Sequence, residues 1–227
     1  MRGSSIPSAI LQAMLLPLPW RIRRPLLNLL FGFKIDRGAR VGLSLLLADR
    51  VAMGEGAYIG DLNVIKKMAE LNLACHAKIG RLNWINGYRS ENSPFFKDAP
   101  DRISALDIEE HGAVTGWHYL DCTNRVRIGA FSILAGMRSQ ILTHSIDVKV
   151  SHQMTAPVAV GRYCFVGTGA ILLQGAVLAD YCVLAAGSVL RSAHREEYCV
   201  LSGVPAEKVR EADKNWAYFH RAVGRVI

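Results

Sequence analysis

The sequence lacks the features that mark a membrane-spanning, disordered or low-complexity chain. No run of 18 apolar residues occurs, so no membrane-spanning helix is predicted. Hydrophobic residues make up 51% of the chain and charged residues 20%, a balance that excludes a disordered protein. The stretch from Ile6 to Leu18 resembles a secretory leader, but Pro7 and Pro17 interrupt it and a small-residue cleavage site is missing. We therefore expect a cytoplasmic protein with a sizeable core.

Paired cysteines are missing as well. The chain contains five cysteines, and no two of them form a CxxC pair. An odd number without such pairs argues against a disulfide framework or a zinc ribbon. We interpret the five as reduced thiols, most of them buried: Cys75, Cys122, Cys164, Cys182 and Cys199.

Acidic residues are scarce at the amino-terminal end. The whole chain has 27 Lys and Arg against 19 Asp and Glu, a formal net charge of +8. Residues 1–40 account for +6 of this, with Asp36 as their one acid, residues 41–190 are neutral, and residues 191–227 carry +2. Such an excess raises the question of a nucleic acid or an anionic membrane as partner. The basic residues are not interleaved with stacking aromatics, so nucleic acid is not expected.

What the sequence does contain is a repeat with a period of six residues. Aliphatic side chains recur at Val160, Val166, Leu172, Leu178, Leu184 and Leu190, and in the same frame at Ile35, Val41, Leu47, Met53 and Ile59. Further blocks contain Leu73, Ile79, Ile108, Val114, Leu120, Ile128 and Leu134. A small residue follows four positions after many of them, as at Cys164, Ala170, Ala176, Cys182 and Ser188. This period predicts short strands joined by turns, with the aliphatic side chain inward and Gly or Ala beside it tolerating the bend.

The repeat resembles that of the hexapeptide-repeat acyltransferases, and the resemblance covers residues 35–210. It implies an all-β fold, a left-handed parallel β-helix in which three hexads form one coil, with about seven coils in total. It also implies a homotrimer. Residues 1–34 then form an amino-terminal segment, and residues 211–227 a carboxy-terminal helix with Trp216, Phe219 and Val223 on one face.

Two interruptions of the repeat, loops 86–107 and 140–159, are where a site is expected. The second loop contains Thr143-His144-Ser145-Ile146-Asp147 between the hexads of Ile128-Gly129 and Val160-Gly161. This segment is similar to the catalytic segment of galactoside, maltose and polysaccharide O-acetyltransferases. The resemblance implies His144 as the catalytic histidine, with Asp121 or Asp147 as its acidic partner.

A histidine suits this chemistry because imidazole titrates near neutral pH and can remove the proton of a sugar hydroxyl as that hydroxyl attacks a thioester. An acidic partner on the other ring nitrogen fixes the tautomer. Asp121 is slightly preferred because it precedes His144 by about one coil, whereas Asp147 is nearer in sequence.

Four further residues are candidates for contact with a carbohydrate acceptor: Trp84, Asn86, Trp117 and His118. Trp117 and His118 interrupt the small-residue pattern, so we expect both to face outward, where Trp117 could stack on a sugar ring or form a trimer contact. The same fold hosts a class of zinc-dependent carbonic anhydrases that needs a His-x₄-His pair. No such pair occurs, so no metal is expected.

The last hexads resemble the strip that binds coenzyme A in relatives. The resemblance implies contacts from Ala186, Gly187, Ser188 and Arg191, and a phosphate contact from Lys208 or Arg210. Val204 and Glu207 depart from the pattern of relatives in this strip.

The basic, apolar segment from Leu15 to Phe33 has two interpretations. It either lies on an anionic membrane at the inner face, or caps the first coil with its arginines solvated. The function expected is O-acetyl transfer from acetyl-CoA to a sugar hydroxyl of a cell-surface polysaccharide or its precursor, with the neutral body binding an uncharged sugar face. N-acetylation of an amino sugar and a catalytically silent scaffold are the alternatives.

Overall fold

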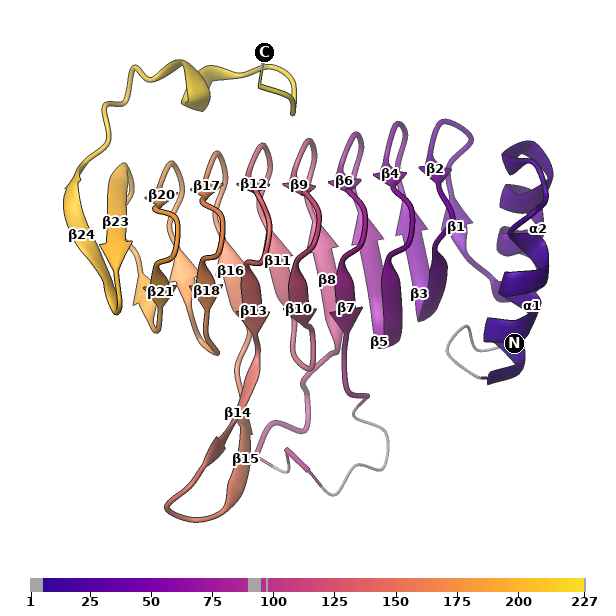
Figure 1. The fold of residues 1–227 in the computed structure, drawn as a ribbon, viewed down its shortest axis with the longest axis horizontal. Helices are drawn as coiled ribbons and strands as arrows, with labels where there is room; N and C mark the ends of the chain where they lie inside the picture. The colour runs from indigo at the N-terminus through magenta and orange to yellow at the C-terminus, as the bar shows by residue number, and fades with distance from the viewer. Residues whose placement is uncertain (1–5, 90–94, 97, 227) are drawn as a thin grey trace.

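The computed structural model describes residues 6–89, 95–96 and 98–226. Its body is a stack of short parallel strands wound into a three-sided coil, with two helices at one end and two loops projecting from one side (Figure 1). The predicted segments 1–34, 86–107 and 211–227 each include residues outside the described ranges, namely 1–5, 90–94, 97 and 227.

Each side of the coil is a ladder of parallel strands from successive turns. The first side contains β1 (Lys34–Ile35), the end of β3 (Leu45–Met53), the end of β5 (Val64–Leu73), β8 (Ala105–Ile108), β11 (Val126–Ile128), β16 (Val158–Val160), β19 (Val177–Leu178) and β22 (Ala193–His194). The second contains β2 (Arg40–Val41), β4 (Tyr58–Ile59), β6 (Lys78–Ile79), β9 (Ala113–Val114), β12 (Ile133–Leu134), β17 (Phe165–Val166), β20 (Val183–Leu184) and β23 (Cys199–Gly203). The third contains the starts of β3 and β5, β7 (Trp84–Asn86), β10 (Tyr119–Asp121), β13 (Gln140–Leu142), β18 (Ile171–Leu172) and β21 (Val189–Leu190).

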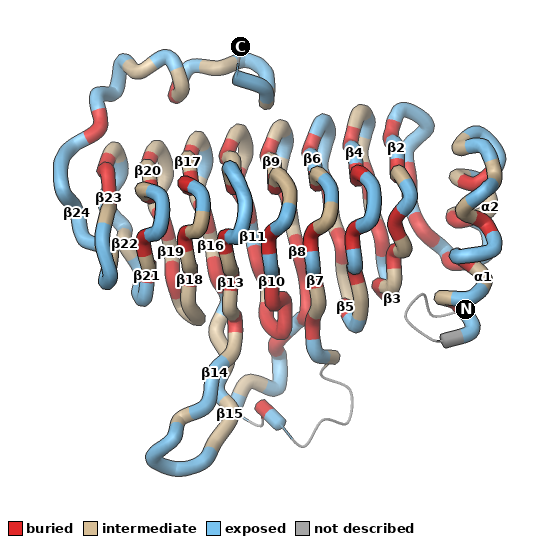
Figure 2. Tube along the Cα trace, in the orientation of Figure 1, coloured by how far each residue is buried: buried red, intermediate tan, exposed pale blue. Residues whose placement is uncertain are grey.

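The strand registers explain the six-residue repeat. Val160 pairs with Leu178, Val166 with Leu184, and Leu172 with Leu190, and all six side chains are buried in the interior (Figure 2). The small residues Cys164, Ala170, Ala176, Cys182 and Ser188 are buried beside them, as predicted. Hydrophobic burial along this interior is the main source of stability, at about 25 cal/mol per Å² of apolar surface.

The inward frame is wrong at one predicted position. Leu46 is buried where Leu47 was expected, and Leu46 pairs with Ile65, which pairs with Ile85. The reason is that β3 and β5 continue without a break from the third side to the first, with a shift of register between Leu47 and Ala48.

The expectation that a glycine beside the inward aliphatic relieves crowding at the bend is confirmed, because a Cβ at Gly129 would lie 2.3 Å from the Gly161 carbonyl of the next coil. At one corner, the left-handed backbone is adopted by aromatic residues and histidines: His76, His111, Phe131, Tyr163, Tyr181 and Tyr198, with φ between 53° and 59°. Their rings stack on one another at centroid distances of 4.6–5.5 Å. Gly161 is required in the same way as Gly129, because a Cβ there would lie 2.4 Å from Asp180 and 2.7 Å from the backbone of the next coil.

The amino-terminal helices α1 (Ile6–Leu15) and α2 (Trp20–Phe31) cover the open end of the first coil. Gln12 closes the polar edge of that coil, because its amide donates to the Leu46 carbonyl at 3.0 Å and accepts from the Leu46 N–H at 2.8 Å. Arg23 is buried and donates to the carbonyls of Val41 and Gly42. The expectation that the arginines of a capping segment are solvated is therefore wrong for Arg23.

The predicted carboxy-terminal helix is also wrong. After β24 (Ala206–Glu211), which pairs antiparallel with β23, the chain runs back along the turns, and residues 212–226 contain only a short 3₁₀ helix, Ala217–His220 (Figure 1). The residues after this helix bond to three successive coils. The Arg221 guanidinium donates to the Phe131 carbonyl, the Arg221 carbonyl accepts from the Tyr163 hydroxyl, and the Gly224 N–H donates to Nδ1 of His111. Phe219 is buried and its ring lies 5.7 Å from Tyr181 and 5.8 Å from Tyr198, so packing on this corner sets the conformation of a segment too short to be a stable helix by itself.

The two loops leave the coil at the same corner. One follows β7 and the other follows β13, and the ends of both strands pair with the end of β10, at Asp121. The second loop is an antiparallel hairpin of β14 (His144–Asp147) and β15 (His152–Thr155). Both loops project to the same side of the molecule, so they form the walls of a site around that corner (Figure 1).

Candidate active site

His144 stands where the chain leaves the coil. The preceding Thr143 is fully buried, and His144 begins the hairpin, so its side chain lies outside the core. Asp121 ends β10, one turn earlier, and pairs with Leu142 in the register of β13. The two residues, 23 positions apart in sequence, are brought together by this stacking.

The imidazole Nδ1 of His144 lies 2.6 Å from Oδ2 of Asp121. Asp121 is fully buried, whereas the His144 side chain is 39% exposed. The hydrogen bond uses Nδ1, so Nε2 is the nitrogen left to exchange a proton with a substrate. This arrangement matches the orientation that a general base requires.

Asp121 is fixed by a set of donors from two turns. Its Oδ1 accepts from the Thr123 N–H at 3.0 Å and the Thr123 hydroxyl at 2.6 Å. Its Oδ2 accepts from the Thr143 N–H at 2.8 Å and the Thr143 hydroxyl at 2.9 Å. Burial alone would raise the pKa of Asp121, but the hydrogen bonds from His144, Thr123 and Thr143 outweigh it and hold this pKa below its ordinary value. The carboxylate therefore stays ionised and anchored.

The same contact acts on the histidine. The hydrogen bond to Asp121 raises the pKa of His144 above 6.5, although partial burial and the positive charge of Arg102 work against it. Asp121 thus stabilises the imidazolium that forms when His144 takes a proton.

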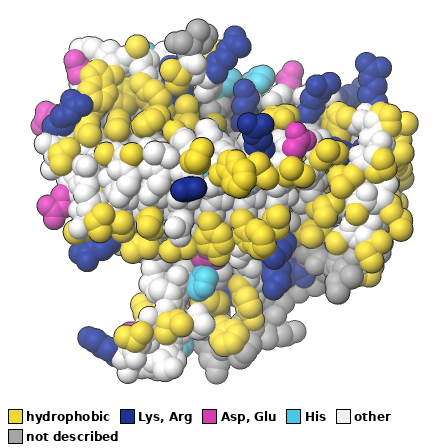
Figure 3. Space-filling model, viewed as in Figure 1, with side chains coloured by type: hydrophobic (Ala, Val, Ile, Leu, Met, Phe, Trp, Pro, Cys, Tyr) yellow, Lys and Arg dark blue, Asp and Glu magenta, His cyan; other side chains and the backbone are white. Residues whose placement is uncertain are grey.

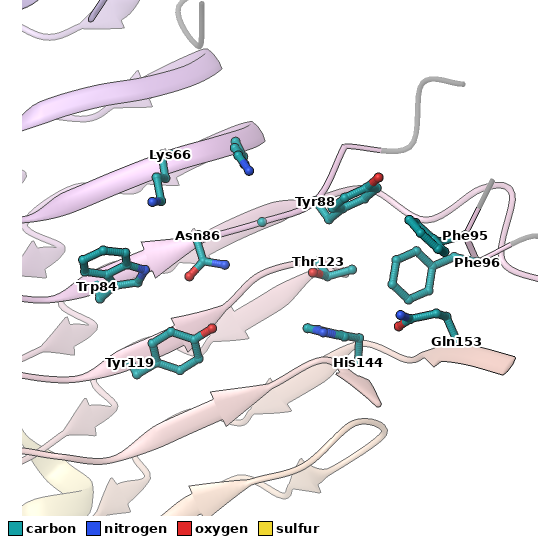
Figure 4. A pocket seen from close by; sticks show the side chains of 12 residues that line it. Lys66, Trp84, Asn86, Tyr88, Phe95, Phe96, Tyr119, Thr123, His144 and Gln153 are labelled. Carbon is teal, nitrogen blue, oxygen red and sulfur yellow. The ribbon is translucent and has the colours of Figure 1, made fainter. Parts of the chain in front are cut away.

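His144 lines a cavity of about 390 Å³ between the two loops (Figure 4). The other lining residues come from β5, β7, β10 and the loops: Lys66, Lys67, Trp84, Asn86, Gly87, Tyr88, Phe95, Phe96, Tyr119, Thr123 and Gln153. The lining is mixed, with aromatic rings and two lysines, and none of these lining residues is acidic. Such a cavity suits a ligand that combines polar groups with a ring that can stack on the aromatic side chains.

Arg102 holds the first loop against the catalytic corner. Its guanidinium donates to the carbonyls of Thr123 at 2.7 Å and Tyr88 at 2.5 Å, and it lies 4.5 Å from the ring centre of Phe96. Phe96 in turn meets the His144 ring edge-to-face at 6.0 Å. The loop therefore forms an apolar wall beside the histidine that restricts water on that side.

The structure separates the residues that the sequence predicted for the acceptor and the base. Trp84 and Asn86 line the cavity with His144. Trp117 is exposed at a corner of the coil and does not line the cavity. Asp147 lies further along the hairpin, opposite His152, and accepts a hydrogen bond from the Lys149 N–H at 2.9 Å.

The expectation that His118 faces outward is wrong. His118 is 2% exposed and belongs to a buried polar column with Asn83 on one coil and Ser139 on another. Its N–H donates to the Asn83 side chain at 2.9 Å, and its Nδ1 accepts from the Ser139 N–H at 3.1 Å. Burial lowers the pKa of His118 to about 4, so it is neutral and structural rather than a sugar contact.

The residues expected to bind coenzyme A lie on the last coils. Ala186 and Gly187 are exposed at a corner, and a Cβ added to Gly187 would meet no atom within 4 Å. Arg191 is also exposed. Ser188 is buried and its Oγ accepts from the Gly203 N–H, so a side-chain contact with a ligand is excluded in this conformation.

The two candidate phosphate-binding residues on β24 already have partners. Lys208 pairs with Glu196 at 2.6 Å and lies 3.7 Å from Glu211. The guanidinium of Arg210 lies 5.1 Å from the ring centre of Trp216. Arg191 is thus the exposed arginine of this group without such an ion pair or ring contact in the described part of the chain.

Several lining residues were not predicted from the sequence. Lys66 and Lys67 occur where β5 crosses a corner, and the repeat alone does not reveal that long strand. The adjacent Phe95 and Phe96 were a visible sign of a packed loop. The roles of Thr123 and Thr143 could not be predicted, because the pairing of β10 with β13 is what places both beside Asp121.

No protein-family model matches the sequence, and no curated protein matches it. Among solved structures, the chain is similar to the polysialic acid O-acetyltransferase OatWY, with a TM-score of 0.60 and 16% identity over 79% of this chain and 84% of that one. It is also similar to a variant of AntD, an N-acyltransferase from Bacillus cereus in complex with dTDP-4-amino-4,6-dideoxyglucose and coenzyme A. There the TM-score is 0.55 and the identity 12%, over 74% of this chain and 84% of that one. At these identities the likeness confirms the resemblance to acyltransferases at the level of the fold.

Proposed function

We propose that the protein is an acetyl-CoA-dependent O-acetyltransferase that acts on a sugar hydroxyl of a cell-surface polysaccharide or its precursor. The observation that carries this proposal is the His144–Asp121 pair, 2.6 Å apart, in the wall of a cavity of about 390 Å³. The likeness in fold to OatWY, whose acceptor is polysialic acid, supports the choice of a sugar polymer.

In the proposed reaction, Nε2 of His144 takes the proton of the acceptor hydroxyl as its oxygen attacks the thioester carbonyl carbon. The tetrahedral intermediate then collapses, the carbon–sulfur bond breaks, and the imidazolium returns the proton to the coenzyme A thiolate. Asp121 holds the ring and stabilises its charge throughout. No cysteine lines the described cavity, and burial raises the pKa of the nearby Cys122 thiol, so direct transfer is favoured over an acyl-cysteine.

The acceptor is proposed to be anionic, in place of the uncharged sugar face expected from the neutral body. Lys66 and Lys67 line the cavity, and Lys66 Nζ lies 4.5 Å from the ring centre of Trp84. A sugar stacked near Trp84 would meet an ammonium group, and a carboxylate or phosphate on that sugar would be attracted by it. Lys66 and Lys67 would then select the acceptor rather than perform the chemistry.

Coenzyme A is proposed to lie along the corner that carries Ala186 and Gly187. The absence of a side chain at Gly187 leaves room for a pantetheine arm against the backbone, and Arg191 would meet a phosphate. The likeness in fold to AntD, which was solved with coenzyme A, supports a site for this cofactor.

The proposal includes a homotrimer of left-handed coils, about seven in each chain, in the cytoplasm, where acetyl-CoA is made available. Exposed hydrophobic side chains outside the cavity support a subunit contact, because Leu43, Leu62 and Trp117 lie exposed on the turns between the second and third sides. In Figure 3 hydrophobic side chains form rows along the stack of coils. Such rows are typical of surfaces that are covered in an assembly.

A thiol-release assay with acetyl-CoA and matched acceptors tests this function. The acceptors are a neutral oligosaccharide, an acidic oligosaccharide and an amino sugar. The proposal predicts the highest kcat/KM for the acidic acceptor, and a Lys66→Gln, Lys67→Gln variant that loses roughly 10-fold in kcat/KM for that acceptor but not for the neutral one. Lys78→Gln, an exposed lysine on the second side, is the control.

The alternatives give different results. Acetylation of the amino sugar on nitrogen, with no ester product, would replace the proposal by N-acyl transfer, which the likeness to AntD favours. No thiol release with any acceptor would favour the catalytically silent scaffold.

A further inference from the structure

A second cluster of reactive side chains lies inside the last coils, away from the cavity of His144. One ligand atom each from Cys182, His194 and Cys199 lies within 4.8 Å of the other two. Both cysteines are fully buried, and His194 is half-buried. Cys182 precedes β20 and Cys199 begins β23, and these strands pair with each other, so the two sulfurs are stacked on successive coils.

His194 occupies a position that the fold normally gives to an aliphatic side chain. In the register of the first side, it pairs with Leu178, which pairs in turn with Val160, and both of these side chains are buried. An imidazole in place of the leucine or valine puts a polar group at the end of the hydrophobic interior, where it is costly without a partner.

One polar atom of this cluster is not satisfied. Nε2 of His194 is buried and has no hydrogen-bond partner among the described residues. Each thiol contacts a backbone carbonyl at 3.3 Å, Cys182 that of Glu196 and Cys199 that of Glu197. Cys182 also accepts from the Cys199 N–H, and Cys199 contacts the Glu196 carboxylate, so the imidazole nitrogen is the unpaired polar atom of the set. Leaving a buried nitrogen unpaired is unfavourable, so its presence beside two thiols points to a bound group that completes the set.

We propose that Cys182, His194 and Cys199 bind one zinc ion. Two thiolates and one imidazole are a ligand set that zinc prefers, and water would take the fourth position. Tetrahedral zinc holds such atoms about 3.5–3.8 Å apart, so a shift of roughly 1 Å from the present spacing closes the site. Each thiol releases its proton to solvent when its sulfur binds the ion.

The ion would fasten the open end of the stack. On the outer side of the last coil, β24 pairs antiparallel with β23. Zinc would join β20, β22 and β23, which carry no other cross-link because all five cysteines are free. The sequence expectation of no metal rested on the missing His-x₄-His pair and on the lack of CxxC pairs, whereas Cys182, His194 and Cys199 come together only through the stacking of the coils.

Zinc titration of the reduced, metal-free protein tests the proposal directly. We expect one zinc per chain by elemental analysis and a thiolate-to-metal absorption band when cobalt(II) replaces zinc. Zinc at 100 times its Kd should raise the Tm by roughly 5 °C or more. His194→Leu restores the aliphatic side chain found at the paired position, so this variant should fold while losing the ion and the Tm shift.

Cys199→Ala should lose the ion as well, whereas Cys164→Ala, which removes a buried thiol outside the cluster, should keep it. The proposal is overturned if zinc does not bind to the reduced protein or if His194→Leu binds it as tightly as the wild type.

Discussion

A histidine bonded to a buried carboxylate is the residue pair on which the proposed chemistry depends. Asp121 contacts Nδ1 of His144 at 2.6 Å and is itself held by Thr123 and Thr143. The side chain of Asp147 is bonded to the Lys149 N–H on the hairpin instead. The geometry therefore favours Asp121 over Asp147 as the partner of the base.

The pH dependence of activity follows from this pair. Because the hydrogen bond raises the pKa of His144 above 6.5, and only the neutral imidazole accepts a proton, kcat/KM should rise with pH through a pKa above 6.5. Asp121→Asn removes the negative charge, so the pKa of His144 should fall. The rise of kcat/KM should then occur at lower pH, and its maximum value at high pH should be lower. An NMR titration of the His144 ring reports the same pKa without turnover. An unchanged His144 pKa in this variant would contradict the assigned partner.

His118 offers a separate test at a single residue. Its Nδ1 accepts the Ser139 N–H inside the coil, so His118→Ala should leave that donor unpaired and lower the free energy of unfolding by about 1–3 kcal/mol. His118→Asn should cost less, because Asn63 and Asn83 fill equivalent places in the same column. Urea unfolding measures both. A large loss of kcat/KM in a folded His118→Asn protein would restore His118 to the site.

Among the elements, the strands were predictable and the ends of the chain were less so. The period of six correctly located buried side chains such as Val166 and Leu184, because each turn repeats the same environment. The period failed at Leu47, where two long strands cross a corner and shift the register. Sequence spacing also could not reveal that Asp121 and His144 meet, since that contact depends on how the coils stack.

The helix predicted for residues 211–227 was wrong because the spacing of Trp216, Phe219 and Val223 fits a helix as well as it fits the observed conformation. In the structure Phe219 is buried and its ring lies 5.7 Å from Tyr181 and 5.8 Å from Tyr198. Short helices are marginal by themselves, so packing on the aromatic corner decides the conformation.

We predict that Phe219→Ala releases this segment from the coils. Amide hydrogen exchange should become faster over residues 212–226, while strands such as β17 and β20 keep their protection. Val223→Ala, at an exposed position, is the control and should leave exchange unchanged. Equal protection of the segment in the Phe219→Ala protein would show that its contacts do not hold it in place.

Considered as a whole, the molecule divides its charge between its parts. Of the basic residues in the first forty, Arg21, Arg23 and Arg24 lie on the cap helix α2, which uses Arg23 internally and exposes Arg21, whereas Lys34, Arg37 and Arg40 are exposed on the first coil. The helices α1 and α2 also expose Ile10, Met14, Ile22 and Leu29, the last at 79%. No helix in the described ranges is long and apolar enough to cross a membrane.

This combination of exposed apolar and basic residues leads us to propose that the cap also binds an anionic lipid surface. Cosedimentation with vesicles should show binding to anionic but not to neutral phospholipid, weakened by salt. Leu29→Glu should reduce binding several-fold, whereas Val209→Glu, on β24 at the other end, should not. If the Leu29→Glu protein binds anionic vesicles as well as the wild type, or if the wild type does not bind them, helices α1 and α2 serve only to cap the first coil.

The central claim is that His144 removes the proton of the acceptor hydroxyl, and the kcat of His144→Ala measures it most directly. Loss of a general base predicts a kcat lower by roughly 10²–10⁴-fold, with KM for the acceptor little changed. His220→Ala, an exposed histidine bonded to the Lys214 carbonyl, should keep the wild-type kcat. A folded His144→Ala protein that acetylates the acceptor at the wild-type rate would contradict the account.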